Sequence, residues 1–175
     1  KAMPVLAQPV PGAVQPSDAA RAALRDGQWA VAAKQLATES GACIRKHGET
    51  AICYELAQGA ALAFGEARQH VAGEPFARQA WMIATKIFGE ADQRTRLSLT
   101  ALAVNLEEQG RLTDAEPLHR ALFAAAEKRL GGDHAETADA ARSVADNLAK
   151  QGRFDNAISW FRRALAITAK GVGEK

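Results

Sequence analysis

The sequence predicts an all-α fold of about four antiparallel helical hairpins stacked into a solenoid, and three observations lead to this prediction. Alanine is the commonest residue, and 47% of the chain is hydrophobic whereas only 6% is aromatic. Sustained alternation of apolar and polar residues, which marks half-buried strands, is missing. Stretches of sequence also recur at a constant spacing of 42 residues, which is the signature of a repeat architecture.

The clearest repeat surrounds two glycines, Gly110 and Gly152. Asn105–Ala115 reads NLEEQGRLTDA and Asn147–Ala157 reads NLAKQGRFDNA, with identical residues at six positions that lie 42 apart. A second pair has the same offset: residues 74–89 read EPFARQAWMIATKIFG and residues 116–131 read EPLHRALFAAAEKRLG. Each glycine lies between two apolar periodic segments, so we expect it to end the first helix of a hairpin in a left-handed conformation.

The helices are assigned in chain order from this pattern. Thr50–Gly65 resembles Thr95–Gly110, so we predict extra residues in the second hairpin around Gln69–Gly73. The predicted helices are 17–26, 29–40, 50–68, 74–88, 92–109, 112–130, 134–151 and 154–170. They form hairpins at about 17–40, 49–88, 92–130 and 134–170, within one repeat domain that spans residues 17–173.

The first sixteen residues differ from the rest. Residues 1–16 contain Pro4, Pro9, Pro11 and Pro16, which predicts an extended tail or linker. The chain begins at Lys1, so we expect a processed product or an excised fragment, and the segment fits either the region after an export signal or an interdomain linker.

The only two cysteines, Cys43 and Cys53, have a spacing that does not suit a metal site. They are either two separately buried thiols or a disulfide that ties the Gly41–Gly48 connection to the next helix. A disulfide requires an oxidising compartment, which gives a periplasmic or secreted location, whereas free thiols leave a cytoplasmic one open.

Charge and hydropathy exclude several classes of partner. The 22 basic and 20 acidic residues are intermixed, for a formal net charge of +2. This balance gives no basic surface for nucleic acid. No apolar run approaches the roughly 20 residues that span a bilayer, so membrane insertion is not expected.

The pattern Leu102-Ala103…Leu106…Gly110…Ala115 resembles the tetratricopeptide repeat. The 42-residue period, with GRLTDAEPLHRAL, KRLGGDHAET and GRFDNAISWFRRALAI, is similar to the longer variant found in kinesin light chains and many bacterial proteins. The resemblance covers roughly residues 17–173, and it implies a right-handed superhelical solenoid whose first helices line a concave groove.

The resemblance also implies a binding role for the groove. Thr100, Ala101, Arg142 and Ser143 stand where a carboxylate clamp would have its Lys, Arg and Asn, so an Hsp70 or Hsp90 tail is not the expected ligand. The alternative for any groove residue is a solvated helix face. The implied groove residues are Tyr54, Glu55, Gln58, Thr100, Val104, Glu107, Arg142, Asp146 and Lys150.

Residues for catalysis do not cluster in the sequence. The four histidines are scattered, and no HExxH, P-loop, dinucleotide-binding or nucleophile-elbow motif occurs. We therefore expect no enzymatic activity, no metal and no cofactor.

Two functions follow from these observations. The chain is a protein–protein interaction scaffold that binds a peptide or partner domain in its groove, or it is a regulatory or substrate-recruiting domain of a larger bacterial enzyme, such as a CHAT-type protease fusion. Weak self-association through an unpaired terminal hairpin is a third expectation.

Overall fold

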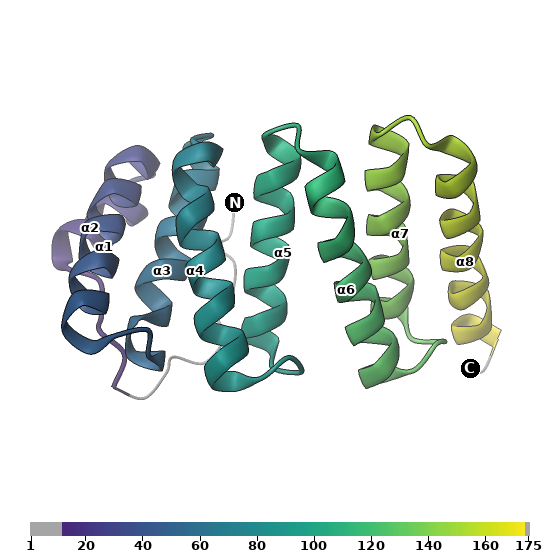
Figure 1. Cartoon of the computed structure of the whole chain (residues 1–175), viewed down its shortest axis with the longest axis horizontal. Helices are drawn as coiled ribbons and strands as arrows, with labels where there is room; N and C mark the ends of the chain where they lie inside the picture. The colour runs from purple at the N-terminus through teal and green to yellow at the C-terminus, as the bar shows by residue number, and fades with distance from the viewer. Residues whose placement is uncertain (1–11, 174–175) are drawn as a thin grey trace. The chain divides into compact units, whose positions relative to one another are not determined.

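The computed structural model describes residues 12–173, and this part of the chain is entirely helical, without strands. It divides by contacts into two compact units, with the boundary after Asn105, inside α5. In each unit consecutive helices lie side by side and run in opposite directions (Figure 1). The helices are α1 (Asp18–Arg25), α2 (Trp29–His47), α3 (Ala51–Glu66), α4 (His70–Phe88), α5 (Gln93–Glu108), α6 (Leu112–Leu130), α7 (Ala135–Lys150) and α8 (Phe154–Gly173).

The all-α prediction is confirmed, and the 42-residue period holds over more of the chain than expected. The first helices of the last three hairpins, α3, α5 and α7, begin at Ala51, Gln93 and Ala135. The second helices, α4, α6 and α8, begin 42 residues apart in the same way. The period therefore runs unbroken from residue 51 into α8.

The turn between α3 and α4 corrects the prediction of extra residues around Gln69–Gly73. Gly65 lies inside α3, and the left-handed residue at this turn is Arg68, with a φ of 56°. Arg68 N–H donates to the Gly65 carbonyl, and Gln69 N–H donates to the Phe64 carbonyl. The same pair of bonds recurs around Gly110, 42 residues later, so the hairpin contains no insertion.

The helix α2 is longer than predicted, because it continues through Gly41 to His47. The predicted Gly41–Gly48 connection is therefore wrong. Ser40 and Cys43 are both buried, so packing of this half of α2 compensates for the weak helix propensity of one glycine. Gly48, with a φ of 71°, ends the helix instead. The helix α4 likewise starts at His70, earlier than the predicted residue 74.

The helix α1 has only eight residues, and residues 13–17 before it are not helical. Ser17 caps α1, with its Oγ accepting a hydrogen bond from Ala20 N–H at 3.2 Å. Val14 N–H donates to the Ile52 carbonyl, and the Val14 side chain packs against the core of α1–α3. Residues 1–11 of the predicted tail lie outside the described residues.

Small residues set the spacing between helices in the first unit, α1 to α4 and most of α5. Leu36 and Leu56 are fully buried among alanines of neighbouring helices, and the rings of Phe64 and Phe76 stack with centroids 5.6 Å apart. Gly73, the fourth residue of α4, lies so close to α3 that an added Cβ would be 2.7 Å from Phe64 Cβ. The α4 backbone at Gly73 therefore packs directly against α3, without room for a side chain between the two helices.

The second unit has its core between α6, α7 and α8. Val144 and Leu148 of α7 are fully buried, and Phe123 of α6 meets Trp160 of α8 edge to face, with ring centroids 5.0 Å apart. Ala157 is buried at the α8 position that matches Gly73 of α4. The predicted role of this alanine, to let the second helix cross closely, agrees with its burial.

Candidate interaction surface

Buried polar side chains connect the hairpins at positions that repeat every 42 residues. Thr95 Oγ1 donates to the Gly89 carbonyl at 2.7 Å, and Thr137 Oγ1 donates to the Gly131 carbonyl at 2.9 Å. Each bond ties the start of a first helix to the end of the preceding second helix. The threonines are identical at the repeat offset, so the sequence contained the signal for this contact.

Two asparagines join neighbouring hairpins in the same repeated way. Asn105 Nδ2 donates to the His70 carbonyl at 2.9 Å, and Asn147 Nδ2 donates to the Leu112 carbonyl at 3.2 Å. His70 and Leu112 are the first residues of α4 and α6. Both asparagines are buried, so their amides serve the packing of hairpins and are not exposed to a partner.

In the first unit, α3 and α5 share a buried hydrogen-bonded cluster. The Tyr54 hydroxyl lies 3.1 Å from Ser98 Oγ and 3.2 Å from the Arg94 carbonyl oxygen, and Ser98 Oγ donates to Gln58 Oε1 at 2.7 Å. Burial raises the pKa of Tyr54 to about 12. This cluster holds two helices together, and Ser98 was not singled out from the sequence.

The burial of this cluster corrects part of the predicted groove. Tyr54 and Gln58 have almost no accessible surface, and their polar atoms bond within the chain. The sequence predicted that both side chains would be available to a partner, and the structure shows that neither is. Glu55, one position along α3, is half-buried.

In the second unit, Glu107 lies at the centre of a polar cluster between α5, α6 and α7. Its Oε1 accepts hydrogen bonds from Asn147 Nδ2 at 2.7 Å and lies 3.0 Å from His119 Nε2. Its Oε2 accepts from Lys150 Nζ at 2.7 Å. The structure thus brings together two predicted groove residues, Glu107 and Lys150, as partners of each other.

The electrostatics of the cluster favour the charged form of Glu107. Burial alone would raise the pKa of this carboxyl, but the hydrogen bonds from Lys150 and Asn147, together with the positive charges nearby, bring the pKa below its ordinary value. Lys150 Nζ is thereby occupied within the chain, although part of its side chain is exposed.

His119 completes the cluster with only one of its ring nitrogens. A carboxylate oxygen can only accept, so Nε2 carries the proton that faces Glu107. Nδ1 is buried, and no group within residues 12–173 hydrogen-bonds to it. His119 is thus a buried residue that joins the cluster through Nε2 alone.

The remaining predicted groove residues lie on solvent-facing stripes of two first helices. On α5, Leu97, Thr100 and Val104 are exposed at helical spacing, and we call them the α5 face. Leu97 and Val104 are 40% and 46% exposed, which leaves two apolar side chains in water on a helix that is otherwise well packed.

The corresponding residues on α7, 42 positions later, are charged. Asp139, Arg142 and Asp146 are all exposed, and we call them the α7 face. An ion pair of 3.1 Å joins Arg142 to Asp139, and both side chains keep more than half of their surface in water. The two faces therefore offer different chemistry, apolar in the first unit and charged in the second.

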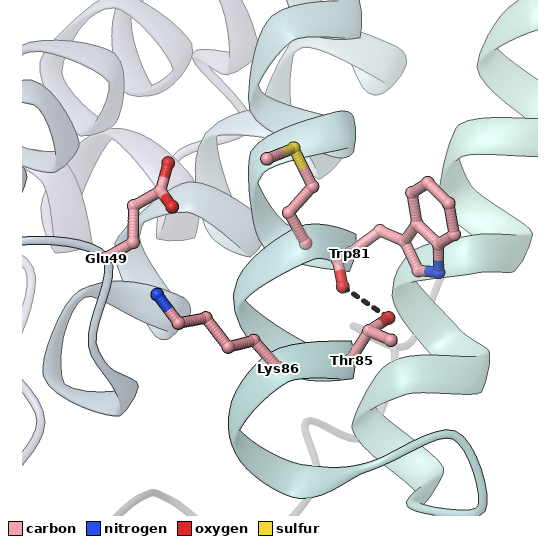
Figure 2. A pocket seen from close by; sticks show the side chains of 5 residues that line it. Glu49, Trp81, Thr85 and Lys86 are labelled. Atoms are coloured by element: carbon pink, nitrogen blue, oxygen red, sulfur yellow. Dashed lines mark hydrogen bonds between the residues drawn. The ribbon is translucent and has the colours of Figure 1, made fainter.

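An open pocket of about 320 Å³ lies on the side of the first unit formed by α4 and the loop after α2. Figure 2 shows Lys86 extending from α4 toward the loop that carries Glu49, with the Thr85 hydroxyl bonded to the Trp81 carbonyl at 2.8 Å. The lining is mostly apolar and includes Met82.

Cys43 and Cys53 form a disulfide that joins α2 to α3, with Cα atoms 5.7 Å apart. Both residues are buried. The bond tethers the C-terminal half of α2, whose helical extension was not predicted, to the start of the next hairpin.

Within the described residues, no group of three or more His, Cys, Asp or Glu side chains is arranged to hold a metal ion. None of the helices in this part of the chain has the length and apolar character required to cross a bilayer.

Comparison with known families adds to the 42-residue period and the repeated turns. Residues 94–170 match the family model of the tetratricopeptide repeat. This part of the chain is thus similar to tetratricopeptide repeats. The matched range covers α6 and α7 and most of α5 and α8, and α3 and α4 continue the same period toward the N-terminus.

Solved structures of tetratricopeptide-type repeats share this fold. BtubC (BKLC) from P. vanneervenii matches with a TM-score of 0.71 and 18% identity, over 86% of this chain and 60% of that one. A putative kinesin light chain from Podosopora anserina with nearly identical TPR-like repeats matches with a TM-score of 0.73 and 20% identity, over 86% of this chain and 72% of that one. The chain thus spans less than two thirds of the BtubC structure. No curated protein matches the sequence.

Proposed function

We propose that this chain is a non-catalytic scaffold that binds a peptide or partner segment on the exposed faces of its first helices. The observation that supports this most directly is the α5 face, where Leu97 and Val104 are exposed although the rest of the helix is well buried. Single exposed apolar residues are common, but two on one stripe beside Thr100 suit contact with a partner.

The rigidity of these helices supports the same proposal. The bonds of Thr95 and Asn105 fix α5 at both ends, and those of Thr137 and Asn147 fix α7. A partner that binds such a preorganised face does not have to order it, so more of the contact energy contributes to affinity. The α5 face favours a segment with apolar residues, and the α7 face favours one with charges of both signs.

The experiment is a quantitative affinity capture from the source organism, with one variant for each face. The α5 variant is Val104→Glu, and the α7 variant combines Arg142→Glu with Asp146→Lys. Lys150 is left unchanged, because Lys150→Glu would place a second carboxylate beside the buried Glu107 and disturb the fold.

Two control variants change the surface away from both faces. Val71→Glu introduces a charge at an apolar α4 residue that is 75% exposed, and Lys128→Glu reverses an exposed charge on α6. We expect specific partners to be lost with at least one face variant and retained with both controls. Equal recovery of every protein by all five forms would reject the proposal.

We also propose that the protein functions in an oxidising compartment, periplasmic or extracellular. The Cys43–Cys53 disulfide supports this, because such bonds persist mainly outside the reducing cytosol. Intact mass of the protein isolated from its source should rise by about 2 Da on reduction, the mass of two hydrogens. An unchanged mass, with both thiols open to alkylation before reduction, would contradict the proposal.

A further inference from the structure

The outer side of α8 carries an apolar stripe that is mostly exposed within the described part of the chain. Phe154, Ile158, Phe161 and Leu165 follow one another at spacings of four, three and four residues, so they share one face of the helix. Phe154, Ile158 and Leu165 are 64%, 46% and 70% exposed, and Phe161 is half-buried. We call these four residues the α8 stripe.

The preceding second helix shows what this face does inside the stack. The α6 residues 42 positions earlier are Leu112, Glu116, His119 and Phe123, and α7 packs on them. His119 and Phe123 are buried there, and Gln151 of α7 bonds to both the Leu112 carbonyl and Glu116. The α8 stripe is therefore the equivalent of an established helix-packing interface.

The α8 stripe is also more apolar than its covered counterpart. Glu116 is replaced by Ile158 and His119 by Phe161, so the exposed face has lost both polar side chains. In repeat proteins, an outer face that stays in water is polar, which keeps the protein soluble. The composition of the α8 stripe is that of a buried contact.

The charges beside the stripe indicate which occupant fits. Asp155 and Arg162 are exposed on the same flank, about 100° and 80° around the helix from Phe154. They are seven residues apart, too far to pair within one helix, and neither forms an ion pair with another described residue. When two copies of a helix pack antiparallel about a two-fold axis, the same flank of each meets the other.

We propose that a second copy of this chain covers the α8 stripe in an antiparallel α8–α8 dimer. Phe154 of one copy then packs near Leu165 of the other, and Ile158 near Phe161. Asp155 of each copy lies within reach of the long Arg162 side chain of its partner, which gives two symmetric ion pairs. In this dimer, α8 of the second copy covers the face of α8 that corresponds to the α6 face covered by α7.

The first test measures the mass of the whole chain in solution by sedimentation equilibrium. The wild type should rise with concentration from 18.6 kDa toward twice that mass. The variant with Ile158→Glu and Leu165→Glu should remain at the monomer mass, and Val71→Glu should dimerise like the wild type. A wild type that stays monomeric up to a protein concentration of ~1 mM would overturn the proposal, because its dissociation constant would then be weaker than millimolar.

The second test uses charge reversal to establish the antiparallel arrangement. Asp155→Arg alone places two arginines together, and Arg162→Asp alone places two aspartates together, so each single variant should weaken dimerisation about tenfold. The double variant restores both ion pairs with reversed polarity and should dimerise like the wild type. A double variant as weak as the singles would contradict this pairing, and unchanged far-UV circular dichroism confirms that every variant is folded.

Discussion

The left-handed backbone conformation of Arg68 could not be predicted from the sequence pattern. It has a φ of 56° at a turn where the corresponding residues, Gly27, Gly110 and Gly152, are glycines. A side chain with a Cβ is strained in this region, and the rest of the turn is stable enough to hold it there. The sequence comparison aligned Gly65 with Gly110, although the predicted helix ran on to residue 68, whereas the left-handed residue at this turn is an arginine.

We expect Arg68→Gly to stabilise the protein by about 1 kcal/mol, because it removes this backbone strain. Urea unfolding followed by circular dichroism measures the change. The matched control is Gly110→Arg, which introduces the same strain into the equivalent turn and should destabilise by a similar amount. An Arg68→Gly variant that is less stable than the wild type would show that the side chain contributes contacts that outweigh the strain.

The Glu107 cluster makes stability depend on pH. The folded state holds the pKa of Glu107 below its ordinary value of 4.5, so the cluster contributes fully above that pH and its contribution is lost as the pH falls through the lowered pKa. We expect Glu107→Gln to be less stable than the wild type at pH 7, with a difference that narrows on acidification below about 4.5.

Urea unfolding over a series of pH values measures this difference. Glu116 also has a lowered pKa, because its bonds to Arg120 and Gln151 outweigh the effect of burial, so some acid sensitivity remains in the Glu107→Gln variant. Parallel stability curves for the two proteins would show that Glu107 is not responsible for the pH dependence assigned to it.

At the scale of helices, Gly73 tests how tightly α4 crosses α3. A Cβ there would lie 2.7 Å from Phe64 Cβ, which is fixed to the α3 backbone and cannot rotate away. We expect Gly73→Ala to cost about 1–3 kcal/mol from overpacking, although alanine occupies the same position in α6 and α8. Thermal unfolding provides the measurement.

Gly59, inside α3, is the matched control for this substitution. Its added Cβ would meet Leu36 Cδ1 at 3.5 Å, an ordinary contact. Gly59→Ala should therefore stabilise the protein by up to about 1 kcal/mol through helix propensity alone. If both variants gained stability, the close crossing of α3 and α4 would be less tight than the distances indicate.

Most helices could be predicted from the repeat because the residues that end them recur at a fixed offset. The errors fall where a glycine has a different role. Gly41 lies inside α2, where buried neighbours and the disulfide keep the helix continuous, and Gly65 lies inside α3. Composition and spacing do not reveal such tertiary compensation.

The groove residues were harder to predict from the sequence than the helices, because packing decides which side chains are exposed. Position on a first helix placed Thr100, Val104, Arg142 and Asp146 on exposed stripes, as expected from the resemblance to tetratricopeptide repeats. Tyr54 and Gln58 occupy comparable helical positions, yet they are buried in contact with Ser98 of α5. A polar residue on a predicted outer face can thus bond to the next helix, and only the packed structure distinguishes the two outcomes.

At the scale of the whole molecule, the described hairpins offer exposed helix faces as their main functional feature. Polar side chains that could have served catalysis, such as His119 and Glu107, bond to each other, and the exposed faces carry apolar or compensated charged residues. Protein–protein binding by rigid helix faces is the function that we propose, and the disulfide and the α8 stripe extend this proposal to location and assembly.

The most direct measurement of this central claim is the affinity of the captured partner for the wild type and for Val104→Glu, by isothermal titration calorimetry. Val71→Glu provides the control. We predict that Val104→Glu raises the dissociation constant at least about tenfold, which corresponds to ~1.4 kcal/mol. We also predict that the control binds like the wild type and that the partner's mass is unchanged after incubation. Equal affinity for all three forms, or a chemically altered partner, would contradict the account.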